Sequence, residues 1–142
     1  LMCQLNNVGT DVAQVDGVRA MTDVTGFRLA GHLLEMRTGS GVDALLDYRA
    51  IPTIAGLDRY LESGCVPGGT QRNFASYGER VAPMTETQRN LLCDPQTSGG
   101  LLIAVDPSSA PEVERILAAA DLPHRPIGEL TRQRGEIRIE IR

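Results

Sequence analysis

Three short segments of the chain combine glycine with small polar side chains in a pattern that suits anion binding. They are Asp23-Val24-Thr25-Gly26, Gly68-Gly69-Thr70 and the run from Asp94 to Gly100. Each stands directly before an expected helix or strand, and free N–H groups and the dipole at a helix N-terminus favour negative charge. Glycine has no Cβ, so the backbone there can approach a ligand closely. The pattern indicates phosphate binding, but none of the segments is a Walker A or dinucleotide motif.

Two of these segments also carry a carboxylate, Asp23 in the first and Asp94 in the third. Carboxylate oxygens are ligands that Mg²⁺ uses together with phosphate oxygens. The candidate residues for lining a phosphate-binding cleft are Thr25, Gly26, Gly68, Gly69, Thr70, Asn73, Asp94, Gln96, Thr97, Ser98 and Gly99.

The same candidates also have purely structural interpretations, which the sequence leaves open. Asp23 can stand beside a helix start and interact with its dipole. Gly68-Gly69 can be only a turn, and the hydroxyls of Thr97 and Ser98 can bond to their own backbone. Asn73 can be an ordinary residue of a helix surface.

The composition excludes several kinds of enzyme site. All 14 basic residues are arginine, so no mechanism in this chain can use a lysine as Schiff base, general base or P-loop ammonium. Its 2 histidines, His32 and His124, are in no Ser/His/Asp order and no H-E-x-x-H spacing. His32 stands beside Leu33 and Leu34 on an apolar helix, which favours a satisfied buried or surface histidine over a ligand.

The net charge of −4 and the scattered arginines give no indication of a nucleic-acid partner. No apolar run approaches the roughly 20 residues that span a bilayer, so we also expect no membrane partner. Cys3, Cys65 and Cys93 are far apart and form no C-x-x-C pair, which argues against a zinc site or disulfide framework. We expect each of them to be a small buried hydrophobe in a reducing, cytoplasmic environment.

The elements that must hold the three segments follow from periodicity and turn residues. Residues 1–142 are long enough for a single domain, and the chain starts within an apolar pattern, as if excised from a longer protein. We expect an α+β fold with a mixed β-sheet covered by helices. The expected helices are 1–14, one from an N-cap at Thr25 to Gly39-Ser40-Gly41, 55–63, 70–79 with Thr70 as N-cap, and two with capping boxes at Thr85 and Ser109. The expected strands are 18–21, 42–48, 101–105, 125–131 and 136–141, the last two joined around Arg134-Gly135.

Order and spacing of the motifs across nearly all of the chain resemble the C-terminal half of the selenophosphate synthetase (selenide, water dikinase) family. The matching motifs are Met21 to Phe27 with Gly31-His32-Leu33, Pro67 to Thr70 with Arg72-Asn73, and Leu91 to Gly100. The resemblance implies that the chain has the fold of the C-terminal domain of the aminoimidazole ribonucleotide synthetase-like superfamily.

The resemblance also implies an activity for the complete protein. Such enzymes make selenophosphate, AMP and phosphate from ATP, selenide and water with Mg²⁺, and the complete protein is a homodimer. The ATP sites lie mainly on an N-terminal half with a glycine-rich loop, a reactive cysteine or selenocysteine and an essential lysine, none of which this chain matches. Asp23 matches a family aspartate that holds Mg²⁺ on the ATP phosphates with N-terminal carboxylates. We therefore expect this fragment alone to be inactive.

Arg28 departs from the family, which usually reads Gly-Phe-Gly-Leu where this chain reads Gly-Phe-Arg-Leu. The side chain can strengthen anion binding or point to solvent, and we favour the solvated arrangement. Two alternatives for the whole chain also stand. It can be a structural or substrate-gating module that binds phosphate, or the equivalent domain of a sister ATP-dependent enzyme of the superfamily.

Overall fold

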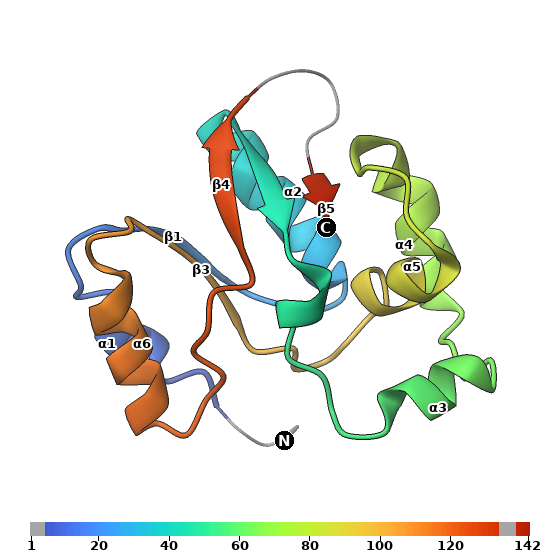
Figure 1. The fold of residues 1–142 in the computed structure, drawn as a ribbon, viewed down its shortest axis with the longest axis horizontal. Helices are drawn as coiled ribbons and strands as arrows, with labels where there is room; N and C mark the ends of the chain where they lie inside the picture. The colour runs from blue at the N-terminus through green and yellow to red at the C-terminus, as the bar shows by residue number, and fades with distance from the viewer. Residues whose placement is uncertain (1–4, 134–138) are drawn as a thin grey trace.

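The computed structural model describes residues 5–133 and 139–142. Helices and strands alternate without a strict repeat (Figure 1). In chain order they are α1 (Gly9–Val12), β1 (Val18–Asp23), α2 (Arg28–Ser40), β2 (Val42–Leu46), η1 (Tyr48–Ala50), α3 (Leu57–Glu62), α4 (Gly69–Tyr77), η2 (Gly78–Arg80), α5 (Glu86–Leu92), β3 (Leu101–Val105), α6 (Ala110–Ala119), β4 (Gly128–Arg132) and β5 (Ile139–Ile141).

Strands β1 and β3 form one antiparallel pair, although most of the chain lies between them in sequence. Asp23 at the end of β1 stands opposite Leu101 at the start of β3. The pairing therefore brings the segment that follows β1 beside the segment that precedes β3. These are the first and third glycine-containing segments of the sequence.

The other described strands form a second sheet in the order β4-β2-β5. Strand β2 pairs with β4 in antiparallel orientation and with β5 in parallel orientation, so this sheet is mixed. The α+β class is confirmed, but the expected single sheet is divided into two. The helices cover both sheets, with α1 and α6 beside the β1–β3 pair and α2 against β2 (Figure 1).

The continuous apolar run of β3 separates two hydrophobic cores. Leu102 belongs to the larger cluster, with α2 and the second sheet, whereas Leu101, Ile103 and Val105 pack against a smaller cluster around Val12. Successive side chains of a strand point to opposite faces, so a strand buried on both faces has no polar alternation. This explains why the Leu101–Val105 segment is apolar at every position.

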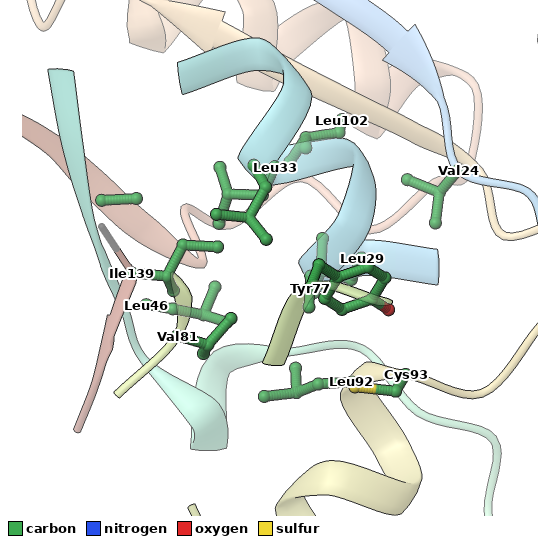
Figure 2. Close-up of a cluster of buried hydrophobic side chains, with 13 residues drawn as sticks. Val24, Leu29, Leu33, Leu46, Tyr77, Val81, Leu92, Cys93, Leu102 and Ile139 are labelled. Carbon is green, nitrogen blue, oxygen red and sulfur yellow. The ribbon is translucent and has the colours of Figure 1, made fainter. Parts of the chain in front are cut away.

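The larger core contains side chains from α2, both sheets and the helices α4 and α5 (Figure 2). Leu34, Leu46 and Ile139 are almost completely buried and fix α2 on the second sheet. Arg37, also buried, donates to the Val42 carbonyl and to Asp43, at 3.4 Å, which anchors the end of α2 to the start of β2. The core thereby fixes α2, the helix that follows the first candidate segment.

Of the four expected N-cap residues, Thr85 and Ser109 stand at the N-cap of their helices, but only Thr85 caps its helix through its side chain. The capping box at Thr85 is confirmed, with Gln88 N–H donating to Thr85 Oγ1 at 3.2 Å. Helix α2 begins only at Arg28 and α4 already at Gly69, so neither Thr25 nor Thr70 caps a helix. Ser109 precedes α6 but accepts no cap hydrogen bond, because its φ of −102° and ψ of −8° are helical rather than extended.

The bounds of other helices and strands also differ from the expected ones. The first helix is only the single turn α1, with Leu5 exposed, and residues 1–4 and the expected turn at 134–135 lie outside the described residues.

Cys93 is buried as expected, whereas Cys65 is exposed, which contradicts its assignment as a core residue, and Cys3 lies outside the described part. Among the described residues, no helix is long and apolar enough to cross a membrane.

Candidate functional site

The first and third segments are held together by reciprocal backbone hydrogen bonds. The Val24 N–H donates to the Gly100 carbonyl and the Gly99 N–H donates to the Val24 carbonyl, each at 2.9 Å. A Cβ at Gly99 would lie 2.7 Å from the Val24 oxygen, so only glycine permits this approach. These bonds extend the β1–β3 ladder into the two loops and fix the distance between them.

Asp23 stands at the rim of this junction with an exposed carboxylate. Its Oδ1 accepts a hydrogen bond from Asn6 Nδ2, which also lies 3.5 Å from the Gly100 carbonyl. Asn6 therefore connects both loops to the segment before α1. Asn6 was not predicted as a site residue, because nothing in its local pattern indicates that the chain start folds back onto the site.

The second segment joins the third through the N-terminus of α4. A Cβ at Gly69 would lie 2.6 Å from Pro95 Cγ, so this glycine allows the helix start to pack against the third loop. Gly68 and Gly26 have open space where a Cβ would stand, so packing requires glycine at neither position. Thr70 is fully buried, and its hydroxyl has no hydrogen-bond partner among the described residues.

Asn73 connects all three segments. Its Nδ2 donates to the Gly26 carbonyl at 2.8 Å and to the Cys93 carbonyl at 3.0 Å, from its position on α4. The side-chain amide thus uses both hydrogens on the backbone of two different loops. The interpretation of Asn73 as an ordinary helix-surface residue is wrong, and all three predicted segments meet at one place.

Arg28 lies inside this junction rather than in solvent. It is half-buried, and its Nε donates to the Leu91 carbonyl at 3.3 Å. Burial lowers the pKa of the guanidinium, and the nearby Asp94 charge opposes that shift. The expected solvated arrangement is therefore wrong. Arg28 also has a φ of 58°, in the left-handed region that glycine tolerates best, which accounts for glycine at the matching position of the family pattern.

The polar side chains of the third segment differ in their surroundings. Gln96 Nε2 donates to Asp94 Oδ2, while Asp94 Oδ1 is buried and has no hydrogen-bond partner among the described residues. Thr97 is exposed and Ser98 half-buried, and neither hydroxyl bonds to its own backbone in the described structure. Within the described part, Asp94 Oδ1, near Arg28, is the one buried side-chain oxygen or nitrogen of this segment that has no hydrogen-bond partner.

A chain of polar contacts runs behind the first segment. Thr25 Oγ1 lies 3.2 Å from His32 Nε2, and His32 Nδ1 lies 3.2 Å from Glu35 Oε2. His32 is 8% exposed, and the Phe27 ring lies edge-on to it with centroids 6.0 Å apart. His32 is thus a satisfied buried histidine, as expected, but its partner is a predicted cleft residue.

Tyr77 and Cys93 are neighbours in the larger hydrophobic core (Figure 2). The Tyr77 hydroxyl donates to the Phe27 carbonyl at 2.9 Å, which ties α4 to the segment before α2. Burial raises the pKa of both the Cys93 thiol and the Tyr77 phenol, so both remain protonated at neutral pH. Their role in this geometry is to support the loops from below.

The described residues do not form a complete metal site. No group of three or more His, Cys, Asp or Glu side chains in residues 5–133 and 139–142 could hold a metal ion. A single exposed carboxylate such as Asp23 still fits Mg²⁺, because this ion is bound by one or two carboxylates when phosphates and water supply the other ligands. A cavity of about 560 Å³ lined by α3, α4 and α5 residues such as Asp58, Gln71 and Asn90 contains none of the predicted site residues.

Known proteins of similar sequence identify the family of this chain. Residues 4–140 match the model of the family described as "AIR synthase related protein, C-terminal domain". A protein named "Selenide, water dikinase" from Aeromonas hydrophila is 56% identical over 99% of this chain and 41% of its own length. Proteins of that name from Pseudomonas aeruginosa and Yersinia pseudotuberculosis are 55% and 57% identical, over 99% and 92% of this chain and 40% and 37% of their own lengths. The chain thus spans about 40% of the length of these relatives, and it belongs to the AIR synthase related protein, C-terminal domain family.

Proposed function

We propose that residues 1–142 are a single domain, the C-terminal half of a selenide, water dikinase, and that this domain forms one wall of its ATP site. The observation that carries the proposal is the junction of three glycine-containing loops with the exposed Asp23 carboxylate at its rim. The identity of 51% or more to proteins of that name supports the same assignment. The complete enzyme would make selenophosphate, AMP and phosphate from ATP, selenide and water in the cytoplasm, as a homodimer.

In this proposal Asp23 is the metal ligand that the domain contributes. Phosphoryl transfer depends mainly on positioning and on neutralising the charge of the phosphates. Mg²⁺ on the ATP phosphates would be held by Asp23 together with carboxylates of the N-terminal half. The N–H groups near Gly26 and Gly68 and the guanidinium of Arg28 would face the phosphates from this side. The domain alone would have no turnover, because it has one carboxylate at the rim and no lysine.

Asp23→Asn in the complete protein tests the metal role. The substitution keeps the size of the side chain and removes the negative charge, so we expect Mg²⁺-dependent ATP turnover to fall at least about 100-fold. Asp58→Asn on the exposed face of α3 is the matched control and should leave turnover unchanged. Turnover of Asp23→Asn within about threefold of wild type would remove Asp23 from the metal site and with it the basis of the proposal.

A further inference from the structure

Thr25, His32 and Glu35 form a continuous chain of polar contacts from the protein surface to the loop junction. The two distances are 3.2 Å each, between Thr25 Oγ1 and His32 Nε2 and between His32 Nδ1 and Glu35 Oε2. The Glu35 side chain is 64% exposed, whereas that of His32 is 10% exposed. Both belong to α2 at a spacing of three residues, so the helix itself sets their contact.

The chemistry of the three groups fixes the direction of each hydrogen bond. An ionised carboxylate only accepts, so His32 Nδ1 must carry the hydrogen that it donates to Glu35. In the neutral imidazole the other ring nitrogen is then an acceptor, and the Thr25 hydroxyl must donate its single hydrogen to Nε2. The Thr25 oxygen is left with lone pairs only.

This direction changes what Thr25 can bind. Thr25 stands two residues after Asp23, whose exposed carboxylate is also an acceptor. An oxygen with lone pairs only cannot donate to a phosphate oxygen, but it can accept from a molecule that brings its own hydrogens. Water fits this requirement, and water is a substrate of the complete enzyme in the proposed function.

We propose that Thr25 binds a water molecule rather than a phosphate oxygen, and that His32 and Glu35 are positioning residues which keep the hydrogen of its hydroxyl directed towards His32, so that the oxygen can only accept. The proposal deepens the proposed function, on which it rests, because it assigns the substrate water to one side of Asp23. Thr25 is thereby separated from the other candidates that were predicted to line a phosphate cleft.

The hydrogen position on His32 is tested directly by NMR, without any activity. In the complete protein with ¹⁵N-labelled histidine at pH 8, His32 is assigned from the signals missing in His32→Gln. We expect Nδ1 to be protonated and Nε2 to have the chemical shift of an unprotonated nitrogen. Glu35→Gln should shift the population towards hydrogen on Nε2. A wild-type ring with the hydrogen on Nε2 would overturn the proposal.

Kinetics of the complete protein then test the role of the Thr25 oxygen. Thr25→Val removes the oxygen at nearly constant volume, so we expect kcat for phosphate release to fall about 100-fold while KM for ATP changes less than about threefold. Thr25→Ser restores the hydroxyl and should recover most of kcat. Thr38→Val, on the same helix but with its hydroxyl bonded to the Leu34 carbonyl at 2.6 Å, is the matched control and should retain wild-type kinetics.

The outcomes separate this inference from the proposed function. If Asp23→Asn abolishes turnover but Thr25→Val raises KM for ATP with kcat unchanged, Thr25 binds phosphate and only this inference fails. If Asp23→Asn retains turnover, the proposed function fails, and the ring-nitrogen measurement still reports on Thr25. Thermal melting of each variant ensures that a loss of kcat is measured on folded protein.

Discussion

Arg28 combines a strained backbone with a favourable side chain, and substitution by alanine and by glycine separates the two. Both variants lose the bond from Nε to the Leu91 carbonyl and the attraction to Asp94. They differ in the backbone, because at a φ of 58° alanine keeps the strain and glycine relieves it. The comparison therefore isolates the cost of the left-handed conformation.

The expected magnitudes follow from these contacts. The lost hydrogen bond from a charged donor contributes about 1 to 2 kcal/mol at this length and partial burial. The left-handed backbone conformation destabilises a residue that has a Cβ by about 1 to 2 kcal/mol. Glycine avoids this strain, but its greater conformational freedom in the unfolded chain lowers the stability of the folded state by about 0.5 to 1 kcal/mol. Arg28→Ala should thus lose about 1 to 2 kcal/mol of unfolding free energy, and Arg28→Gly about 0.5 to 1 kcal/mol less than that.

Urea denaturation of wild type and both variants at one pH measures these differences as midpoint shifts with a common slope. For a chain of this size, the difference between the variants corresponds to a melting temperature about 2 to 4 °C higher for glycine. The reasoning is refuted if the alanine variant is as stable as the glycine variant, because the backbone strain at Arg28 would then be absent.

Two further predictions concern the parts that support the junction. Gly99→Ala should destabilise the protein by about 1 to 3 kcal/mol, because the new Cβ would lie 2.7 Å from the Val24 carbonyl oxygen. Gly39→Ala is the control: Gly39 lies within α2 with open space around it, so this substitution should stabilise the protein slightly. Equal melting temperatures for the two variants would contradict this prediction. Burial raises the folded-state pKa of Cys93 above its ordinary value of 9.0, so as pH rises the thiol loses its proton in the unfolded chain before it does in the folded one. The contribution of the thiol to the free energy of unfolding is therefore complete below about pH 8.5 and is lost as pH rises towards the folded-state pKa. Urea midpoints between pH 7 and 10 should therefore fall less steeply for Cys93→Ala than for wild type, and parallel curves would exclude Cys93 as the cause.

Local signals in the sequence predicted strand β3 and the helix formed by residues 86–92 well, whereas β1, β2 and β4 differ from their expected bounds by up to three residues. Residues 136–138 of the last expected strand lie outside the described part. The apolar run at 101–105 and the Thr85 capping box depend on neighbouring residues only, and both were predicted at the right positions. The caps assigned to Thr25 and Thr70 were wrong because tertiary contacts decide them. Thr25 bonds to His32 on the next helix, and Thr70 is buried beside Gly69, where the helix start packs against the distant Pro95.

The candidate site was predictable as a set of segments but not as a geometry. The glycine and polar composition identified the three loops, and the structure brings them together. The roles of Asn6, Asn73 and Arg28 could not be derived, because each depends on backbone carbonyls of a distant segment. A carbonyl leaves no trace in the local sequence pattern, so such partners become visible only when the chain is folded.

The loop junction is held largely by main-chain atoms, and this has a consequence for how the site can change in evolution. Val24, Gly99 and Gly100 bond through their backbones, and Asn73 also bonds to carbonyls. The exposed side chain of Thr97 is therefore not required to keep the loops in position. A new side chain at this position can alter what the cleft recognises while the scaffold below it stays the same.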